Sequence, residues 1–168
     1  MSARAPRLVI GGTGSGCGKT TITCALLQAF VERGLDTAAF KCGPDYIDPM
    51  FHSRIIGTRS RNLDAFLCGR EQVPALLQHS AGRDISVIEG VMGYYDGIAG
   101  TSSENSTADI ARLTQSPTVL VVSAKGMSLT LAALLRGFLQ FEQNTIRGVI
   151  LNGILPRMTD YYAGIVEQ

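Results

Sequence analysis

A glycine-rich segment follows the first apolar run of the chain directly. The run occupies residues 8–10 and the segment residues 11–21, in front of a stretch with helical spacing. Glycines let the backbone curl so that consecutive N–H groups point inward, and a helix N-terminus adds the positive end of its dipole. Lys19 is placed to reach phosphate oxygens, and the Thr20 hydroxyl is placed to ligate Mg²⁺. The pattern therefore predicts a strand, a phosphate-binding loop and a helix in that order.

The loop departs from the commonest form of this motif. That form has a glycine five positions before the Gly-Lys pair, and Thr13 stands there in this chain, with Gly12 one position further out. A glycine-rich segment can also be a simple turn. The preceding strand, the Gly-Lys-Thr-Thr sequence and the following helix favour phosphate binding. The residues that we expect to contact a nucleotide here are Thr13, Gly14, Ser15, Gly16, Cys17, Gly18, Lys19, Thr20 and Thr21.

The composition is that of a globular chain with room for one domain. Of its 168 residues, 45% are hydrophobic and 17% are charged, and the net charge of +1 argues against a nucleic-acid or membrane-surface function. The four cysteines show no C-x-x-C spacing, which favours reduced thiols and a cytoplasmic protein. The first residues have no signal-peptide pattern, and no apolar run is long enough to span a bilayer.

Strands and helices are expected to alternate along the chain. Apolar runs predict strands at 8–10, 37–41, 85–88, 118–122 and 146–151, and helical spacing predicts helices at 19–33, 70–80, 107–114 and 129–141. Because the strands are continuously apolar, both faces of their sheet should be covered. The order predicts an α/β fold, a three-layer α/β/α domain of the P-loop NTPase type with a mainly parallel sheet. Its ligands should bind at the carboxyl edge of that sheet.

Acidic residues follow two of the predicted strands. Glu89 ends the strand at 85–88, and Asp45 and Asp48 lie in a proline-containing segment, 42–49, that we expect to be a loop. Together with Thr20, Glu89 and one of these aspartates are suited to hold Mg²⁺. Two structural alternatives stay open. A strand-end carboxylate can simply be solvated, and Asp48-Pro49 can be the N-cap and first residue of a helix.

The two histidines carry no metal-ligand spacing. His79 is expected at the surface and His52 in packing, and no zinc site is predicted.

With these residues in hand, the chain resembles the N-terminal, ATP-binding part of the cobyrinic acid a,c-diamide synthase family, in the dethiobiotin synthetase-like branch of P-loop proteins. The likeness covers nearly the whole chain and is carried by residues 12–21, 41–49, 60–64, 89–97, 106–108 and 151–152. The Gly-Pro-Asp-Tyr-Ile-Asp-Pro sequence at 43–49 and the Glu-Gly-Val-Met-Gly sequence at 89–93 are its most specific parts.

The resemblance implies an ATP- and Mg²⁺-dependent amidation of the a and c side-chain carboxylates of a corrinoid such as cobyrinic acid, in cobalamin biosynthesis. A carboxylate attacks the γ-phosphate, and ammonia then displaces phosphate from the acyl phosphate. It assigns catalysis to Lys19, Asp45, Asp48, Glu89 and Asp96, and Mg²⁺ binding to Thr20, Asp48 and Glu89. It assigns adenine recognition to Asn152, and substrate contacts to Tyr46, Arg61, Ser106 and Thr107.

The chain also departs from the family pattern. Ser123 stands where relatives usually have aspartate after a strand, which removes any role tied to that carboxylate. The family's full chains carry a C-terminal glutaminase domain that makes ammonia from glutamine. We therefore expect residues 1–168 to be one ATP-binding synthetase domain, truncated and without that glutaminase domain. A homodimer is compatible with the sequence.

Other functions compete with this interpretation. A nickel-sirohydrochlorin a,c-diamide synthase shares the same motifs, so the sequence leaves the macrocycle open. A dethiobiotin synthetase-like ligase is disfavoured by the sequence at 43–49. A nucleotide switch of the partitioning type is disfavoured by Gly14, because those proteins commonly have a lysine at that position.

Overall fold

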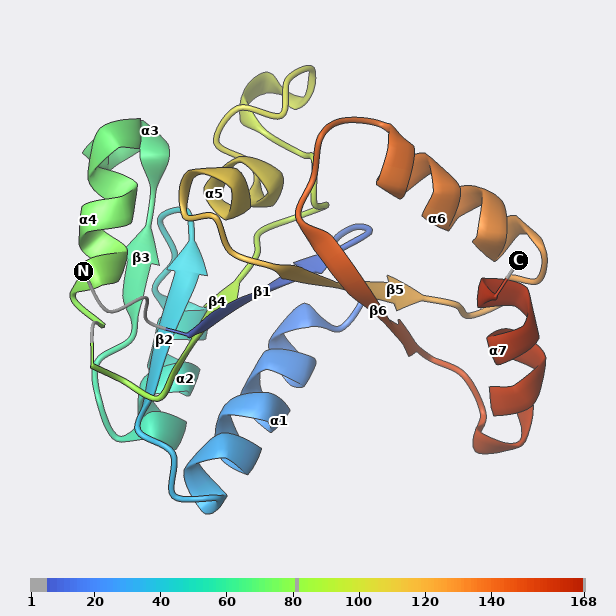
Figure 1. Cartoon of the computed structure of the whole chain (residues 1–168), viewed down its shortest axis with the longest axis horizontal. Helices are drawn as coiled ribbons and strands as arrows, with labels where there is room; N and C mark the ends of the chain where they lie inside the picture. The colour runs from blue at the N-terminus through green and yellow to red at the C-terminus, as the bar shows by residue number, and fades with distance from the viewer. Residues whose placement is uncertain (1–5, 81, 168) are drawn as a thin grey trace.

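In the computed structural model, which describes residues 6–80 and 82–167, six strands form one sheet (Figure 1). The expectation that the first residues have no signal-peptide pattern concerns mainly residues 1–5, which lie outside the described part of the chain. Gln168 also lies outside it. The strands are β1 (Arg7–Gly12), β2 (Thr37–Cys42), β3 (Arg61–Leu63), β4 (Ile85–Glu89), β5 (Thr118–Ser123) and β6 (Ile146–Asn152). Their order is β3-β2-β4-β1-β5-β6, and every pair is parallel. All strands therefore end at one edge of the sheet.

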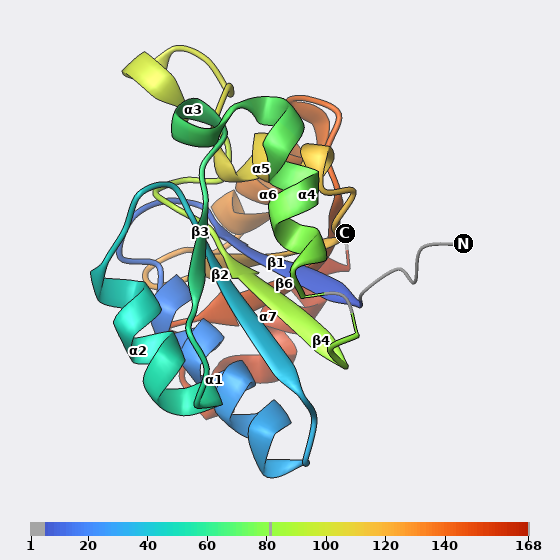
Figure 2. The same cartoon turned by 90° about the vertical axis from the view of Figure 1, so that its left-hand side faces the viewer.

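Helices cover both faces of this sheet (Figures 1 and 2). They are α1 (Lys19–Glu32), α2 (Ile47–Ile56), α3 (Ala65–Cys68), α4 (Val73–Gln78), α5 (Thr107–Leu113), α6 (Thr130–Gln140) and α7 (Thr159–Val166), with 3₁₀ turns η1 (Arg70–Gln72), η2 (Ile98–Gly100) and η3 (Pro156–Met158). On β1, Val9 packs with residues of α4 and α5, whereas its neighbour Ile10 packs with Leu27 of α1. The predicted three-layer architecture is confirmed. None of the described helices is long and apolar enough to cross a membrane.

Helix α2 is the main difference from the sequence-based expectation. It begins at Ile47, inside the segment expected to be a loop, and Pro49 lies in its first turn. Proline is tolerated there because the N–H groups of a first turn have no partner within the helix. The side chain that accepts from the helix start is Asp45, whose Oδ1 lies 2.8 Å from the Ile47 nitrogen and 3.3 Å from the Asp48 nitrogen. The alternative in which a helix begins at Asp48-Pro49 is therefore close to the structure, but the helix starts at Ile47 and Asp48 is not its N-cap.

Smaller differences concern short elements. The helix expected at 70–80 is divided into η1 and α4, and the edge strand β3 was not predicted because a strand of 3 residues has no readable period. The remaining predicted strands and helices are present, with ends shifted by a few residues.

The register of the sheet places Glu89 and Lys41 next to each other at its carboxyl edge. The Cα atom of Glu89 is paired with Ile10 of β1 on one side and with Lys41 of β2 on the other. Side chains at paired positions of a sheet point to the same face. The loops that follow β1, β2 and β4 therefore meet around Glu89 and Lys41.

Candidate active site

The phosphate loop joins β1 to α1 and carries its lysine folded back over the loop. Gly16 has φ 73° and Gly18 has φ 105°, a left-handed conformation that favours glycine. The Lys19 ammonium donates to the carbonyl oxygens of Gly14, at 2.9 Å, and of Met92, at 2.7 Å. The loop, together with Lys41 and Glu89, lines a cavity of about 390 Å³. This loop can present backbone N–H groups and an ammonium to a phosphate chain.

A buried ionic cluster lies beside the loop. The Lys41 ammonium is 2.6 Å from Asp48 Oδ2, 3.1 Å from Glu89 Oε1 and 3.0 Å from the Gly90 carbonyl oxygen. The Thr20 hydroxyl donates to Glu89 Oε1 at 2.5 Å and lies 3.5 Å from Asp48 Oδ2. The structure thus brings together Thr20, Asp48 and Glu89, as the sequence predicted, and adds Lys41.

His52 holds the other oxygen of Glu89. Its Nε2 is 2.7 Å from Glu89 Oε2, its Nδ1 is 3.3 Å from Ser60 Oγ, and the ring is fully buried. The expectation that His52 belongs to the packing is confirmed, as is the surface position of His79. The hydrogen bond from His52 to Glu89 was missed, because nothing in the linear spacing connects the two residues.

The charges of the cluster support one another. Burial alone would raise the pKa of Glu89, but the hydrogen bond to His52, the charge of Lys41 and the Thr20 hydroxyl bring that pKa below its ordinary value. Burial alone would lower the pKa of Lys41, but the charge of Glu89 and the hydrogen bond to Asp48 raise it. Both side chains are therefore ionised at neutral pH.

The oxygen atoms of the cluster fit a hard cation. One hydroxyl and two carboxylates, from Thr20, Asp48 and Glu89, converge where the Lys41 ammonium already supplies a positive charge. Within residues 6–80 and 82–167, no group of three or more His, Cys, Asp or Glu side chains could hold a metal by itself. This donor set suits Mg²⁺, which usually takes one or two carboxylates and fills its other positions with phosphate oxygens and water.

Asn152 lies against the phosphate loop. Its Nδ2 donates to the Cys17 carbonyl oxygen at 2.9 Å, and its Oδ1 accepts from the Gly153 nitrogen at 2.9 Å. A Cβ atom on Gly18 would lie only 2.3 Å from this Nδ2. Asn152 thus steadies the loop, and its contact with adenine stays a prediction. Ser123 pairs with Asn152 in the register of β5 and β6, so the missing aspartate would have stood next to this contact.

The cluster does not include Asp96, Ser106 or Thr107. Asp96 is exposed, and its carboxylate accepts from the Gly93 nitrogen at 2.8 Å, which closes the turn after β4. Ser106 is buried and caps α5 by accepting from the Asp109 nitrogen at 3.2 Å. Thr107 is buried too, and its hydroxyl is hydrogen-bonded to the backbone of a neighbouring loop. Their catalytic or substrate roles stay predictions, and these contacts give each side chain a structural role.

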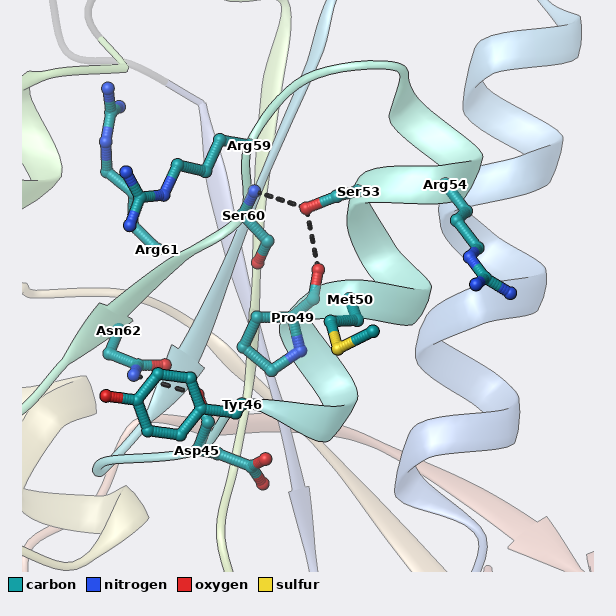
Figure 3. A pocket seen from close by; sticks show the side chains of 10 residues that line it. All are labelled: Asp45, Tyr46, Pro49, Met50, Ser53, Arg54, Arg59, Ser60, Arg61 and Asn62. Atoms are coloured by element: carbon teal, nitrogen blue, oxygen red, sulfur yellow. Dashed lines mark hydrogen bonds between the residues drawn. The ribbon is translucent and has the colours of Figure 1, made fainter.

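Tyr46 and Arg61 line a second, larger cavity of about 680 Å³ between α2 and β3 (Figure 3). The Tyr46 side chain is 85% exposed. Asp45 lines the same cavity, and its Oδ2 lies 3.9 Å from the Lys41 ammonium of the ionic cluster. The second cavity therefore adjoins the phosphate site.

Comparison with known proteins connects this geometry to a family. Residues 8–166 match CbiA, described as the CobQ/CobB/MinD/ParA nucleotide binding domain. The chain belongs to this family. The CbiA-family domain is 50% identical over 151 residues to the hydrogenobyrinate a,c-diamide synthase of Streptomyces coelicolor, with 89% of this chain and 31% of that protein covered. It is 45% identical over 152 residues to the cobyrinate a,c-diamide synthase of Thermoplasma volcanium, with 90% and 33% covered. The chain spans about a third of the length of these curated relatives.

Solved structures support the fold. The signal recognition particle 54 kDa protein of Aeropyrum pernix K1, in complex with GDP, matches with a TM-score of 0.64 at 16% identity, over 99% of this chain and 40% of that one. The hydrogenase maturation factor HypB of Archaeoglobus fulgidus matches with a TM-score of 0.62 at 12% identity, over 98% and 74%. Both the predicted fold class and the predicted family are confirmed.

Proposed function

We propose that this CbiA-family domain uses ATP to activate side-chain carboxylates of a corrinoid, so that ammonia converts them into amides. The observation that carries the proposal is the cluster of Thr20, Lys41, Asp48 and Glu89 at the mouth of the phosphate loop. The relatives named as a,c-diamide synthases support the choice of substrate.

The phosphate loop would bind the triphosphate. Lys19 now donates to two backbone carbonyl oxygens, and it would exchange them for phosphate oxygens without leaving the loop. Thr20, Asp48 and Glu89 would hold Mg²⁺, which neutralises charge on the phosphate oxygens. Positioning and charge neutralisation are what phosphoryl transfer needs most from a protein.

The chemistry requires two displacements. A carboxylate is a poor acyl donor, so its oxygen first attacks the γ-phosphorus and ADP leaves. Ammonia then attacks the carbonyl carbon of the acyl phosphate, inorganic phosphate leaves, and a proton is released as the amide forms. Lys41 lies where it can attract the incoming carboxylate and screen it from Asp48 and Glu89. As the resemblance implies, the ammonia would come from glutamine by way of a separate glutaminase domain.

The test supplies ammonia directly. The purified chain is incubated with Mg²⁺, γ-³²P-labelled ATP, cobyrinic acid and ammonium chloride, and label transfer and amide formation are followed by chromatography and mass spectrometry. We expect Lys19→Ala to lose label transfer because nucleotide binding weakens, and Glu89→Gln to lose it because the carboxylate that would hold the metal is gone. Arg33→Gln, an exposed change at the end of α1, is the matched control.

The outcomes separate the competing functions. Label transfer that survives both Lys19→Ala and Glu89→Gln would refute the site. A rate of ATP hydrolysis that no macrocycle changes but that depends on dimerisation would favour a nucleotide switch. Replacing cobyrinic acid by hydrogenobyrinic acid or nickel-sirohydrochlorin identifies the preferred macrocycle.

A further inference from the structure

The cavity between α2 and β3 has walls of two kinds (Figure 3). Its volume of about 680 Å³ lies within the range of small-molecule sites. Tyr46 and Met50 form one wall with side chains that are 85% and 60% exposed, while Arg59 and Arg61 stand on the opposite side. An apolar wall facing guanidinium groups suits a ligand with a broad apolar body and anionic groups at its rim.

Arg59 and Arg61 both line this cavity, and within the part of the chain that the structure describes their guanidinium groups have no protein partner. Figure 3 shows both side chains extending to the same side, whereas Arg54, at the end of α2, points the opposite way. Within the described residues, neither Arg59 nor Arg61 has a hydrogen bond or ion pair from its guanidinium group. Each of these two unpaired positive charges would stabilise an anionic group of a ligand in the cavity.

The acidic side chain in the lining of this cavity already has partners. Asp45 is the acidic residue of the cavity lining, and its Oδ1 accepts from the first turn of α2. Its Oδ2 faces the Lys41 ammonium at 3.9 Å. Asp45 therefore does not neutralise the two arginines, and it lies between the lining of this cavity and the ionic cluster.

We propose that this cavity binds the body of a macrocyclic polycarboxylate, with Arg59 and Arg61 anchoring carboxylates that are not themselves amidated. The proposal rests on the proposed function, because Asp45 lies beside Lys41 and another carboxylate of the same molecule would have to reach Lys41 from this side. Tyr46 and Met50 cover the face of the ring. Arg59 and Arg61 thus determine which carboxylate of the substrate is presented to the phosphate site.

Equilibrium titration of the full chain with cobyrinic acid tests this directly, followed by the absorbance of the macrocycle and without ATP. A bidentate guanidinium-carboxylate pair in a partly exposed site should contribute about tenfold in affinity, so we expect Arg59→Gln and Arg61→Gln each to weaken binding by about tenfold. Arg59→Lys keeps the charge but loses the planar fork, and should fall between wild type and Arg59→Gln. Arg33→Gln, at the exposed end of α1 and outside the lining of this cavity, is the matched control, with affinity unchanged within about twofold.

Binding of a non-hydrolysable ATP analogue is measured in parallel. We expect the arginine variants to bind the analogue as wild type does, which shows that they are folded and that the phosphate site is intact. An unchanged affinity of Arg59→Gln and Arg61→Gln for cobyrinic acid would overturn the anchor assignment and leave the proposed function standing. A loss in Arg33→Gln equal to that in the pair would also overturn it, because removal of any positive charge would then weaken binding.

A wild-type chain that binds no cobyrinic acid would count against the proposed substrate. The titration is then repeated with nickel-sirohydrochlorin and with uroporphyrin, which are also macrocyclic polycarboxylates. Binding that depends on Arg59 and Arg61 would support the cavity even though the corrinoid assignment had failed. No binding of any of these probes would overturn the inference.

Discussion

Replacing Lys41 by methionine removes the cation that bridges two carboxylates of the candidate active site. Methionine has a similar length and no charge, so it fills the space while leaving Asp48 and Glu89 facing each other. Asp48 loses a partner at 2.6 Å and Glu89 one at 3.1 Å. Glu89 is fully buried, whereas the Asp48 side chain is 18% exposed and can gain water.

The expected cost follows from this geometry. Removing one partner of a buried ion pair destabilises a protein by about 3–5 kcal/mol. Glu89 keeps the hydrogen bonds to His52, at 2.7 Å, and Thr20, at 2.5 Å, so we expect a value near the lower end, about 3 kcal/mol. Typical domains are stable by about 5–15 kcal/mol, so the variant should still fold.

Urea denaturation followed by circular dichroism at pH 7 measures the difference in the free energy of unfolding between wild type and Lys41→Met. Lys125→Met, at an exposed position, is the matched control. Adding Glu89→Gln to Lys41→Met should recover part of the lost stability, because the buried charge is then gone. Lowering the pH should reduce the difference in the free energy of unfolding between Lys41→Met and wild type, since Glu89 without Lys41 is more easily protonated. A loss below about 1 kcal/mol, or no recovery in the double variant, would refute the reasoning.

The remaining predictions concern acid stability, the loop and the thiols. The pKa of the Glu89 carboxyl lies below its ordinary 4.5, so the ionised carboxylate stabilises the fold fully above pH 4.5 and stops doing so as the pH falls through the folded-state pKa. The urea midpoint of Glu89→Gln should therefore fall less steeply over this pH range than that of wild type. Gly18→Ala places a Cβ atom 2.3 Å from Asn152 Nδ2 at φ 105°, so calorimetry should show at least about a tenfold loss of ATP affinity with the circular dichroism spectrum retained. Burial raises the pKa of Cys42 to about 12, so iodoacetamide should label exposed Cys68 in the native protein and Cys42 only in urea; mass spectrometry showing native labelling of Cys42 would contradict its burial.

Local patterns explain why much of the fold could be predicted. The β1, β4 and β5 strands are short apolar runs bounded by polar or glycine residues, and their boundaries can be read without knowing their neighbours. The phosphate loop is likewise a continuous motif, and in the structure Lys19 folds back over this loop while Thr20 lies against Glu89. The position of Glu89 at the end of a predicted strand was enough to predict that it lies at the same edge of the sheet as the phosphate loop.

The contacts that were missed depend on register and on helix phase. Lys41 meets Glu89 because β2 and β4 are neighbours with these two residues paired, and strand order cannot be read from either strand alone. His52 meets Glu89 because α2 begins at Ile47; a loop prediction for this segment hides the phase of the helix. The alternative in which Asp48-Pro49 caps and begins a helix came within two residues of the observed start, since proline is tolerated in a first turn.

Helix α2 connects the ionic cluster with the second cavity. Asp48 and His52 are four residues apart and lie on one side of the helix, where Asp48 contacts Lys41 and His52 contacts Glu89. The next residue, Ser53, lines the other cavity and accepts from the Ser60 nitrogen at 2.9 Å. The same short helix therefore carries one wall of the second cavity and the side chains that contact Lys41 and Glu89 in the ionic cluster. Since transfer requires the receiving carboxylate and the γ-phosphate to be aligned, a single rigid element between them fixes that alignment better than two separate loops would.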